Sequence, residues 1–360
     1  MAICANGRFR VHKVTGVQRY AEEITRRLSS HLRICQPQRF RRGWRGHFWE
    51  QALLPLYSYG DVLWSPCAAG PILAQHHVVT FHDLFPVDSP EWYRKSYAVW
   101  YRMLLSTLAR TAQHIIAVSY FTKERIVERF GVNAAKITVI HNGVDHEVFR
   151  PTHPDRVKAA GTALNLPTSR YLLCVGSLEP RKNLKRLLAA WSALLNELPS
   201  DLWLVVAGSK DPQVYRSAGI KELPERVFLA GYVPDCYLSG LYSGSIGFLY
   251  PSLGEGFGLP PLEAMACGVP VLTSRISSLP EVCSGAALYV DPTDMDELVR
   301  ALRVLVKDAS RCSILSAVGR ERAREFTWDR ASAETLRVLQ RVALSGPGIS
   351  QLRQHSEPLP

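Results

Sequence analysis

The 360-residue sequence has no long apolar run and no closely paired cysteines. No stretch approaches the ~18–20 consecutive apolar residues that a membrane-spanning helix needs. The first residues lack the apolar core and the small-residue cleavage site of a signal peptide, so we expect a cytoplasmic protein. The composition, 47% hydrophobic and 21% charged, is that of a globular chain, and the length suits two domains of ordinary size.

The eight cysteines lie far apart in the sequence. A zinc cluster needs closely spaced thiolates, and a disulfide framework is typical of a small secreted chain. We therefore expect reduced, mostly buried thiols and no structural metal. The pair His76 and His77 is expected at the edge of a strand, because no other ligands accompany it. Asp294-Met295-Asp296 has the form of a metal-binding DxD motif, but it precedes Glu297 and an apolar helix, so Asp294 is predicted to cap that helix.

Positive charge is concentrated in the first part of the chain. Residues 1–150 contain 20 Lys and Arg against 11 Asp and Glu, whereas residues 151–360 contain 23 against 21. Basic and aromatic residues are interleaved in the segment 39–49 (Arg39, Phe40, Arg41, Arg42, Trp44, Arg45, Phe48 and Trp49). Such a mixture suits an anionic membrane surface; the alternative is a basic loop whose aromatic rings pack into the core. No recognised nucleic-acid motif accompanies the charge, and we expect no nucleic-acid partner.

Apolar strands alternate with amphipathic helices in both halves, which predicts the α/β class with parallel sheets covered by helices. In the first half, the spacing predicts helices at 16–30 and 120–130 and strands at 77–81, 115–118 and 137–140. In the second half, it predicts a helix after residue 183 and strands at 171–175, 202–207, 227–229, 246–249 and 269–273.

Proline and glycine in the stretch 150–168 mark the expected domain connection. We predict an N-terminal domain of residues 1–155 and a C-terminal domain of residues 156–332. A last helix, at about 333–345, is expected to pack back on the first domain. The tail 346–360 is predicted to be disordered.

The first candidate site is the segment 176–183, GSLEPRKN, which follows a predicted strand and opens a helix. In open parallel sheets, ligands bind beyond the carboxyl ends of the strands. Free backbone N–H groups and the dipole at a helix start favour an anion there. Arg181 adds a guanidinium fork and Lys182 a point charge, which suits two adjacent phosphates. The alternative is a pair of solvated cations beside an Asn cap.

The second candidate site is the segment 251–263, PSLGEGFGLPPLE. Three glycines in five positions let the backbone approach a ligand closely, and the following prolines suit the first turn of a helix. Glu255 is expected in the loop and Glu263 on the helix, both directed at one cleft. Carboxylates are suited to binding sugar hydroxyls. Alone, each glutamate has an ordinary alternative as a solvated turn or helix residue, but the two together within this frame favour a ligand.

These motifs resemble the donor-binding domain of glycosyltransferase family 4. The resemblance rests on GSLEPRKN, on PSLGEGFGLPPLEAMACGVPVLTSRISSLPEV, and on two glutamates separated by seven residues, Glu255 and Glu263. It is strong over about 170–335 and weaker in TGVQRYAEEI, TFHDL, AVSYFTKERI and VIHNGVDHEVFRP. It implies the GT-B fold, in which two Rossmann-like domains with parallel sheets face each other across a cleft, and transfer that retains the donor's anomeric configuration.

The resemblance also implies roles for single residues of the second half. Arg181 and Lys182, after the loop that begins at Gly176, would bind the donor diphosphate and stabilise its charge as it leaves. Glu263 would bind the nucleotide ribose. Glu255 would contact hydroxyls of the transferred sugar, beside the backbone of Gly256, Phe257, Gly258 and Leu259. The two cations would act at the diphosphate much as a metal does, so no metal ion or other cofactor is implied.

In the first half, two residues match the family pattern. His82, which ends a predicted strand, resembles the family histidine near the sugar. Gly16 heads the first helix, where the family places a glycine-containing loop against donor and acceptor. The sequence departs from the pattern at Ser177, where some members carry an arginine, and in NGRFRVHKVTG, which replaces a compact double-glycine turn. Without that arginine, Arg181 and Lys182 are the residues expected to bind the phosphates. The acceptor contacts of the NGRFRVHKVTG segment stay unassigned.

The implied function is hexose transfer from a nucleotide-diphosphate sugar to a saccharide or a lipid-linked saccharide in cell-surface polysaccharide synthesis, such as that of lipopolysaccharide. The motifs resemble those of bacterial mannosyltransferases, so GDP-mannose is the expected donor, with UDP-sugars as the alternative. Glu255 is expected to position the sugar, with a nucleophilic role in a double displacement as the alternative. We expect the protein at the inner face of the cytoplasmic membrane if segment 39–49 binds lipid.

Two other functions fit parts of the sequence. A sugar-nucleotide epimerase on the same fold would share the diphosphate site but would need its own acid and base. A non-catalytic, membrane-associated assembly factor would use only the basic N-terminal face. Such a factor has no need of Arg181, Lys182 and both glutamates, so these residues together favour the transferase.

Overall fold

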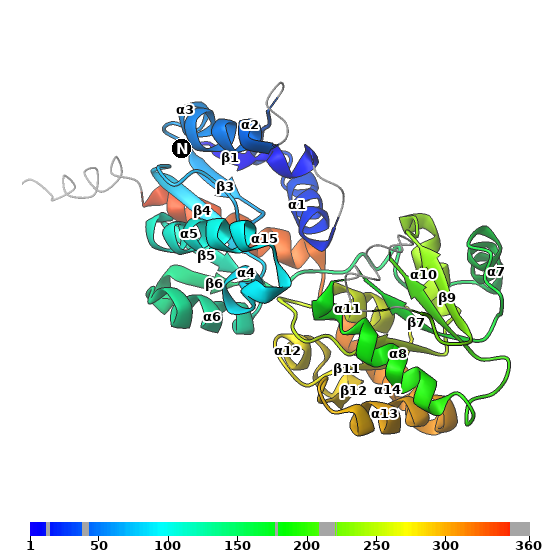
Figure 1. Ribbon diagram of the computed structural model, residues 1–360. Helices are drawn as coiled ribbons and strands as arrows, with labels where there is room; N and C mark the ends of the chain where they lie inside the picture. Colours follow the sequence, from blue (N-terminus) through cyan, green and yellow to red (C-terminus); the bar gives the residue numbers. More distant parts are fainter. Residues whose placement is uncertain (12–14, 38–42, 177–178, 209–219, 221, 346–360) are drawn as a thin grey trace, which may run out of the picture. The chain divides into compact units, whose positions relative to one another are not determined.

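The computed structural model describes residues 1–11, 15–37, 43–176, 179–208, 220 and 222–345 (Figure 1). The predicted disordered tail 346–360 lies outside these residues, as do Ser177 and the basic and aromatic residues Arg39, Phe40, Arg41 and Arg42. The chain divides into two compact units, one formed by Met1–Gly143 with Trp328–Pro360 and the other by Val144–Thr327.

The units change over at residues 143/144 and 327/328, whereas the limits predicted from the sequence are 155/156 and 332/333. Helix α7 (Pro154–Ala163) packs on α10 (Asp235–Ser243) of the second unit. A Cβ added at Gly240 would lie only 2.7 Å from the carbonyl oxygen of Arg156, so this glycine permits the close approach. Helix α15 (Trp328–Leu344) packs on α1 (Gly16–Arg27) of the first unit.

The first unit contains a six-stranded parallel sheet in the order β2-β1-β3-β4-β5-β6. Its strands are β1 (Ile3–Asn6), β2 (Arg33–Cys35), β3 (Val62–Ser65), β4 (His76–Phe81), β5 (His114–Ala117) and β6 (Ile137–Val139). The sequence predicts β4, β5 and β6. It does not predict the other three, which are only three or four residues long and give no clear period-2 signal.

Side chains alternate between the two faces of β4, as expected for a strand. Val79 and Phe81 pack into a core with α5 (Lys95–Thr111) and α6 (Tyr120–Phe130). On the other face, the hydroxyl of Thr80 lies 3.3 Å from that of Tyr20 in α1. His77 is 1% exposed and its Nε2 lies 2.8 Å from the hydroxyl oxygen of Ser65 in β3, so it is a buried interior residue rather than an edge residue.

The second unit contains a six-stranded parallel sheet in the order β12-β11-β10-β7-β8-β9. Its strands are β7 (Tyr171–Val175), β8 (Trp203–Ala207), β9 (Val227–Gly231), β10 (Gly247–Tyr250), β11 (Val271–Ser274) and β12 (Ala287–Val290). Leucines of α8 (Leu184–Leu194) and α13 (Met295–Lys307) pack on this sheet around the fully buried Trp191. Asp294 caps α13, its Oδ1 accepting from the backbone N–H of Glu297 at 2.9 Å, as predicted.

The remaining described helices lie between these strands, apart from α14, which follows the last strand, β12. In the first unit they are the short turns η1 (Gly7–Val11), η3 (Pro90–Trp92) and η4 (Ala134–Lys136), the helices α2 (Gly43–Phe48), α3 (Leu54–Tyr57) and α4 (Phe85–Asp88), and the π-helix η2 (Trp49–Leu53). In the second unit they are η5 (Pro180–Lys182), η6 (Ser284–Ala286), α11 (Leu259–Ala266), α12 (Leu279–Cys283) and α14 (Ala309–Arg324).

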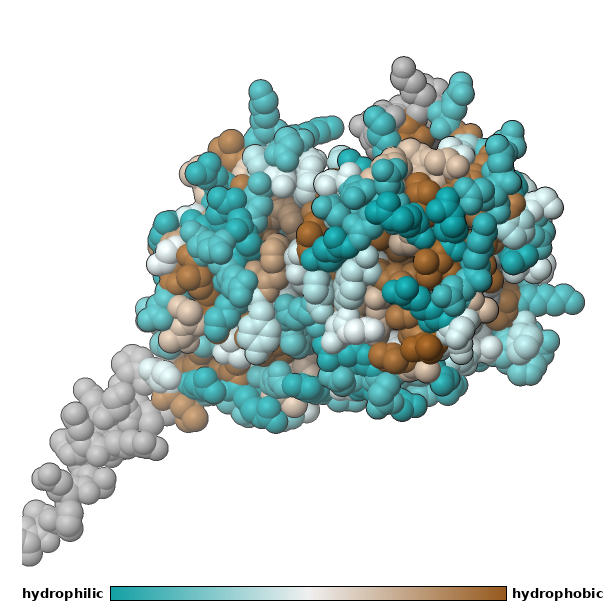
Figure 2. All heavy atoms as spheres, turned by 90° about the horizontal axis from the view of Figure 1, so that it is seen from below, coloured by the Kyte–Doolittle hydropathy of each residue, from teal (hydrophilic) through white to brown (hydrophobic). Residues whose placement is uncertain are grey.

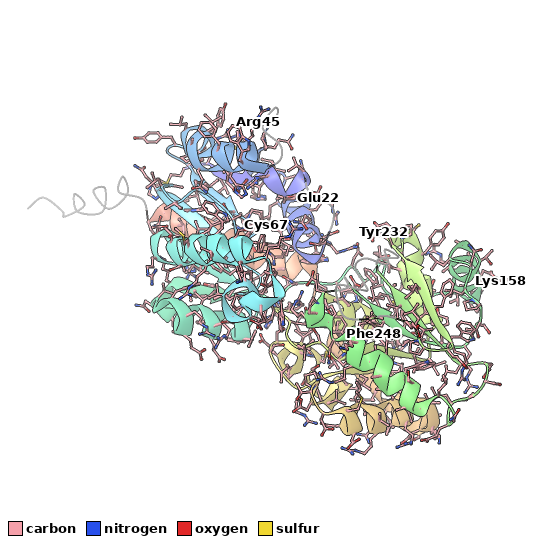
Figure 3. The ribbon with its side chains drawn as sticks, viewed as in Figure 1. Glu22, Arg45, Cys67, Lys158, Tyr232 and Phe248 are labelled. Carbon is pink, nitrogen blue, oxygen red and sulfur yellow. A yellow bond between two sulfur atoms is a disulfide. The ribbon has the colours of Figure 1, made fainter. Side chains whose placement is uncertain are left out.

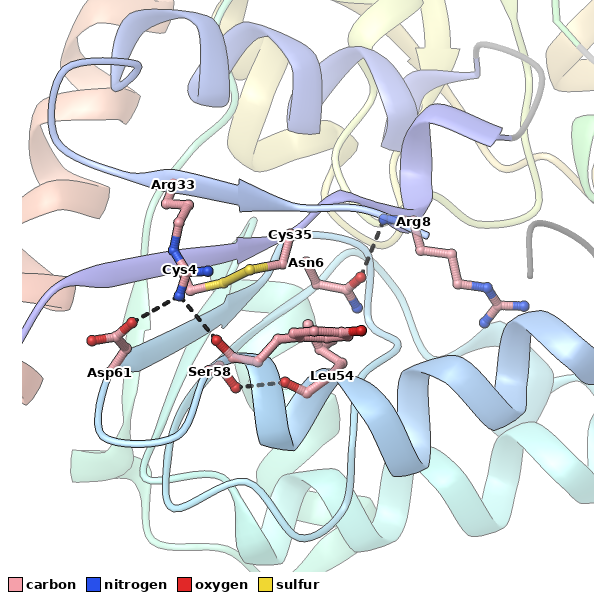
Figure 4. Close-up of a disulfide and its surroundings, with 9 residues drawn as sticks. Cys4, Asn6, Arg8, Arg33, Cys35, Leu54, Ser58 and Asp61 are labelled. Atoms are coloured by element: carbon pink, nitrogen blue, oxygen red, sulfur yellow. Dashed lines mark hydrogen bonds and ion pairs between the residues drawn. A yellow bond between two sulfur atoms is a disulfide. The ribbon is translucent and has the colours of Figure 1, made fainter. Parts of the chain in front are cut away.

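A disulfide joins Cys4 of β1 to Cys35 of β2, so the prediction that all cysteines are reduced is wrong for this pair (Figure 4). The two residues are 31 positions apart, yet their Cα atoms lie 6.4 Å apart because the strands pair in parallel. Spacing in the sequence does not reveal this proximity, which depends on the strand order. The other six cysteines are free thiols.

No helix in the described part of the chain has the length and apolar character needed to cross a membrane. On the face drawn in Figure 2, hydrophilic side chains surround separate apolar spots.

Candidate functional site

The two candidate motifs meet at one point of the second sheet. From β7, the chain continues to β8 and β9 on one side, whereas β10, β11 and β12 lie on the other. The connections after β7 and β10 therefore diverge and leave a crevice at their carboxyl ends, the usual place for a ligand in an open parallel sheet. Segment 176–183 follows β7 and segment 251–263 follows β10.

Both predicted cations bind the predicted sugar-contacting glutamate. Nη1 of Arg181 lies 2.6 Å from Oε2 of Glu255, and Nζ of Lys182 lies 2.7 Å from Oε1. The hydroxyl of Ser252 donates to the same Oε1 at 2.6 Å. The side chains of Arg181, Lys182 and Glu255 are only 13%, 12% and 7% exposed. The solvated-cation alternative is therefore wrong, and the three groups form a buried charged cluster.

The electrostatics of this cluster keep Glu255 ionised. Burial by itself would raise the pKa of Glu255, but Arg181, Lys182 and the hydroxyl of Ser252 lower it to about 2. Burial lowers the pKa of Lys182, and the adjacent carboxylate opposes that shift. Since the pKa of Glu255 is depressed, its contribution to stability is present above its ordinary pKa near 4.5 and is lost as the pH falls toward 2.

Asn183 fixes the segment that carries the two cations. It has a φ of 58°, in the left-handed region, and ends the turn η5 just before α8. Its side-chain amide donates to the carbonyl oxygens of Pro251 at 3.0 Å and Pro292 at 2.7 Å, so it ties this turn to the loops after β10 and β12. The backbone N–H of Leu253 also donates to the carbonyl oxygen of Arg181 at 2.7 Å.

Two serines hold the glycine-rich loop that presents Glu255. The hydroxyl of Ser278 lies 2.8 Å from both the carbonyl oxygen of Glu255 and that of Phe257. The backbone N–H of Glu255 donates to the hydroxyl of Ser277 at 3.0 Å. Gly258 has a φ of 108°, and an added Cβ would lie 2.9 Å from Cδ2 of Leu279. The neighbouring Gly256 is buried and Leu259 begins α11, so this loop has the tight backbone that its glycines predict.

Gly176, at the end of β7, lies under the side chain of Lys182. A Cβ at Gly176 would be 3.6 Å from Cε of Lys182 and 3.7 Å from its Cγ. The backbone N–H of Gly176 donates to the carbonyl oxygen of Ala207 at 3.0 Å, which continues the pairing of β7 with β8. These are ordinary van der Waals distances, so the stem of Lys182 packs directly over the end of β7.

An aromatic row connects the two glutamates. Glu263, on α11, is 7% exposed, and its Oε2 accepts from the hydroxyl of Tyr242 at 2.9 Å. The ring of Tyr242 lies 5.4 Å from that of Phe248, and Phe248 stacks at 5.8 Å on Tyr250. Figure 3 labels Phe248 on β10, at the middle of this row. The hydroxyl of Tyr250 accepts from Lys182. Tyr242 therefore holds Glu263 at one end of the row, and Tyr250 holds Lys182 at the other.

Replacing Tyr250 by phenylalanine is expected to lower kcat about tenfold. The change keeps the ring 4.8 Å from Nζ of Lys182 but removes the hydroxyl that the ammonium group binds, and a hydrogen bond to a charged group contributes about 1.5–3 kcal/mol. Initial rates of the sugar transfer that the sequence predicts check this, with Tyr232→Phe at an exposed position as the control. An unchanged kcat would show that the hydroxyl does not position Lys182.

The first unit holds His82 and Gly16. His82 directly follows β4 and is 8% exposed. Burial lowers its pKa to about 4, so the ring is neutral at neutral pH. Its Nε2 lies 2.7 Å from the carbonyl oxygen of Pro66; since a carbonyl only accepts, Nε2 carries the proton. Gly16 is the first residue of α1, as predicted, and follows the cap residue Thr15.

Several residues of the site carry no sequence signal. Ser252 lies inside the glycine-rich motif, but nothing in its spacing predicts a bond to Glu255. Tyr242 and Tyr250 appear in the sequence as ordinary core aromatics, and Ser277 and Ser278 as loop residues. Only the strand order places them around the two motifs. Among the described residues, no group of three or more His, Cys, Asp and Glu is arranged to hold a metal ion.

The chain matches two family models, Glycosyl transferases group 1 over residues 162–322 and Glycosyltransferase Family 4 over residues 58–148. It is 32% identical over 272 residues to the O-antigen chain mannosyltransferase B of Escherichia coli, covering 74% of this chain and 70% of that protein. The chain belongs to glycosyltransferase family 4. As a member of this family, it is a glycosyltransferase.

Two further comparisons agree with this membership. The O-antigen chain mannosyltransferase RfbU of Salmonella typhimurium is 31% identical over 227 residues, covering 62% of this glycosyltransferase and 58% of RfbU. The solved structure of WaaG, a glycosyltransferase involved in lipopolysaccharide biosynthesis, matches with a TM-score of 0.72 at 16% identity, covering 94% of this chain and 99% of that one. The fold is therefore the predicted GT-B fold, with two α/β units that each contain a parallel sheet.

Proposed function

We propose that this glycosyltransferase moves a mannosyl group from GDP-mannose to a saccharide, free or lipid-linked, in the synthesis of a cell-surface polysaccharide. The observation that carries the proposal is the cluster of Arg181, Lys182 and Glu255 at the point where the strand order of the second sheet reverses. Two adjacent cations suit a diphosphate, and a carboxylate beside them suits the sugar that the diphosphate carries. The E. coli and Salmonella relatives are named as O-antigen mannosyltransferases, which supports mannose; a UDP-sugar is the alternative donor.

In the proposed reaction, the bond from the anomeric carbon to the diphosphate oxygen breaks and the acceptor hydroxyl oxygen forms the new bond to that carbon. The acceptor's proton passes to the departing phosphate oxygen. Arg181 and Lys182 stabilise the negative charge that develops on the leaving group, which is the electrostatic contribution that a metal ion supplies in other enzymes. We propose that Glu263, buried and bound by Tyr242, takes the nucleotide ribose.

Glu255 is proposed to position the sugar. A carboxylate with a pKa of about 2 that accepts from Arg181, Lys182 and Ser252 is a weak base and a weak nucleophile. This favours the positioning role over the covalent intermediate of a double displacement. His82, with a neutral ring and its proton on Nε2, is proposed to contact the sugar through its other nitrogen.

A thermal-shift screen with GDP, UDP, ADP and dTDP in the presence of EDTA tests the proposal. We expect a saturable rise of the unfolding temperature with GDP that is lost in Arg181→Ala and Lys182→Ala. A rise with UDP alone would identify a UDP-sugar as the donor in place of GDP-mannose. No rise with any nucleotide would contradict the diphosphate site. A rise that vanishes with EDTA would contradict the proposal that no metal is needed. Incubation with GDP-mannose and no acceptor also distinguishes an epimerase, which would convert the sugar nucleotide.

We also propose peripheral contact with an anionic membrane, which would place the enzyme at the cytoplasmic face. On α2, Trp44 and Phe48 are 74% and 52% exposed, which favours a surface role over the core-packing alternative for these two rings. Arg45, labelled in Figure 3, follows Trp44 in the sequence, and its guanidinium carbon lies 5.6 Å from the centre of the Trp44 ring. Trp49, in contrast, is 4% exposed and belongs to the core. Exposed aromatic rings beside cations suit a layer of anionic headgroups.

The membrane proposal predicts binding to vesicles that contain anionic lipid. Neutralising Arg41, Arg42 and Arg45 together is expected to weaken this binding at least tenfold, since each basic residue near such a surface contributes ~1 kcal/mol. Vesicle sedimentation at two salt concentrations measures it, with neutral vesicles and a triple variant of exposed arginines elsewhere as controls. Unchanged binding in the Arg41, Arg42 and Arg45 variant would overturn the proposal.

A further inference from the structure

The loop that carries Glu255 contains few side chains that could hold it in place. Its central residues are Gly-Glu-Gly-Phe-Gly at 254–258, and glycine leaves the backbone more conformational freedom than any other residue does. Phe257 is the only large apolar side chain among these five residues. The position of the carboxylate therefore depends on contacts that the rest of the second unit makes with residues 251–258, called here the Glu255 loop.

One of these contacts comes from α12, which follows Ser278. The hydroxyl of Ser278 lies 2.8 Å from the carbonyl oxygen of Glu255 and 2.8 Å from that of Phe257. Helix α12 has only five residues, and a helix of that length is not stable by itself. The grip of Ser278 on the Glu255 loop therefore depends on what holds α12.

Arg322 of α14 binds the carboxyl end of α12; both helices are labelled in Figure 1. Its Nη2 donates to the carbonyl oxygen of Glu281 at 2.7 Å, and its Nε donates to that of Val282 at 3.0 Å. The last carbonyl groups of a helix lack partners within the helix, and a cation placed there also interacts favourably with the helix dipole. One guanidinium group thus fixes the end of α12 opposite Ser278.

The same guanidinium group packs on Phe326, just beyond the end of α14. Its central carbon lies 4.7 Å from the centre of the Phe326 ring, which is a cation–π distance. The Phe326 ring meets the ring of Phe257 edge to face, with centroids 5.8 Å apart and planes at 73°. Both rings are 4% exposed. Arg322 therefore supports the Glu255 loop by two routes, one through α12 and one through Phe326.

The backbone of Phe326 is fixed where the two ends of the second unit pair. Its carbonyl oxygen accepts from the N–H of Val144 at 3.2 Å, and Val144 forms a parallel bridge with Thr327. Val144 and Thr327 are the first and last residues of this unit. The ring that packs on Phe257 is thus anchored to a part of the unit that lies far from the Glu255 loop in the sequence.

We propose that Arg322 and Phe326 are positioning residues for sugar transfer, which hold the Glu255 loop so that its carboxylate meets the sugar. The inference rests on the proposed role of Glu255 and extends it to two residues outside both sequence motifs. Neither residue contacts the sugar in this proposal, because both act through the loop. A misplacement of ~1 Å in an active site can lower a rate by ~10²-fold, so such support has a large effect on turnover.

Phe326→Leu tests the ring contact, because it keeps an apolar side chain and removes the edge-to-face pair. We expect kcat to fall at least about tenfold. The Kd for the nucleoside diphosphate should not rise, since Arg181 and Lys182 belong to η5 and not to the Glu255 loop. The matched control is Phe130→Leu in the core of the first unit, where the ring is 6% exposed. It removes the same ring and should leave kcat within about twofold.

Arg322→Lys tests the other contact, because lysine keeps the charge but lacks the planar fork that reaches two carbonyl groups. We expect kcat to fall at least about threefold, with Arg324→Lys as the control at a 70% exposed position of the same helix. The side chain of Arg322 is 22% exposed, so this variant is expected to fold even if Phe326→Leu does not. In the double variant of Phe257→Leu and Phe326→Leu, kcat should be no more than about twofold below that of the lower single variant, since both changes break one contact.

Hydrogen exchange measures the support of the loop without reference to activity. In Phe326→Leu and Arg322→Lys, peptides that cover 251–263 should exchange at least about fivefold faster than in the wild type, and peptides that cover β7 should exchange at the wild-type rate. Faster exchange together with a lower kcat and an undiminished affinity for the nucleoside diphosphate supports the proposal. Unchanged exchange in 251–263 overturns it, as does an unchanged kcat in Phe326→Leu.

Two further outcomes separate this inference from its alternatives. Weaker binding of the nucleoside diphosphate by Phe326→Leu, or an equal loss of kcat in Phe130→Leu, would show general damage to the fold and overturn the positioning role. A wild-type protein that transferred no sugar would contradict the proposed function and the positioning role with it. Faster exchange in the variants would then show only that Arg322 and Phe326 stabilise the loop.

Discussion

Lys182→Ala is expected to lower kcat/KM by about 10²–10³-fold, the loss seen when one preorganised donor to a developing charge is removed. The Lys182 side chain is 12% exposed, so its charge acts in a site where water screens it little. Three features place it: the left-handed Asn183 that follows it, the Tyr250 hydroxyl, and Gly176 beneath its stem. Most of the loss should appear in kcat, because the charge on the diphosphate grows as the bond to the sugar breaks.

The matched control is Lys185→Ala, three residues further along, at an exposed position of α8. It removes the same charge from the same region of the unit and should leave kcat/KM within twofold. Steady-state kinetics with the donor identified by the nucleotide screen measure both variants. If Lys182→Ala raised only KM for the donor and left kcat unchanged, Lys182 would bind the ground state and the transition state equally, which would contradict a selective role toward the leaving charge.

Glu255→Gln is expected to strengthen binding of the nucleoside diphosphate and to slow sugar transfer. In the free protein, the carboxylate pairs with both Arg181 and Lys182, at 2.6 and 2.7 Å, and offsets one of their two positive charges. The amide removes the carboxylate that Arg181 and Lys182 share and leaves the more exposed Glu179 as an ion-pair partner of Arg181. The Kd for the nucleoside diphosphate should therefore fall by about three- to tenfold, which corresponds to ~0.7–1.4 kcal/mol. The kcat for sugar transfer should fall at least 10²-fold, because the sugar loses the carboxylate that holds its hydroxyls.

Isothermal titration with the nucleoside diphosphate and initial rates with the nucleotide sugar give the two quantities. Ser252→Ala serves as the comparison, since it removes one hydrogen bond to Glu255 and keeps the charge. Weaker binding of the nucleoside diphosphate by Glu255→Gln would show that the carboxylate holds Arg181 and Lys182 in place for the diphosphate instead of competing with it. An unchanged kcat would show that Glu255 does not hold the sugar for transfer.

The sequence by itself predicted the fold class and the two motifs that meet in the charged cluster. Buried parallel strands such as 171–175 are continuous apolar runs, and the cations, glycines and glutamates occur in two short segments whose local conformation follows from their composition. Local signals of this kind also predict α15 and the cap at Asp294, because helix periodicity and capping involve residues only a few positions apart.

Only the tertiary structure decided which distant residues meet. The strand order brings the loop after β7 to the loop after β10, and so joins Lys182 to Glu255 across 73 positions. It also pairs Cys4 with Cys35 and places Glu50 beside Arg8, neither of which has a signal in the spacing of the sequence. The physical reason is that hydrophobic periodicity specifies which face of a strand is buried, but not which strand lies next to it. That neighbour is selected by packing across the whole sheet, and the residues that line a site at the strand ends are selected with it.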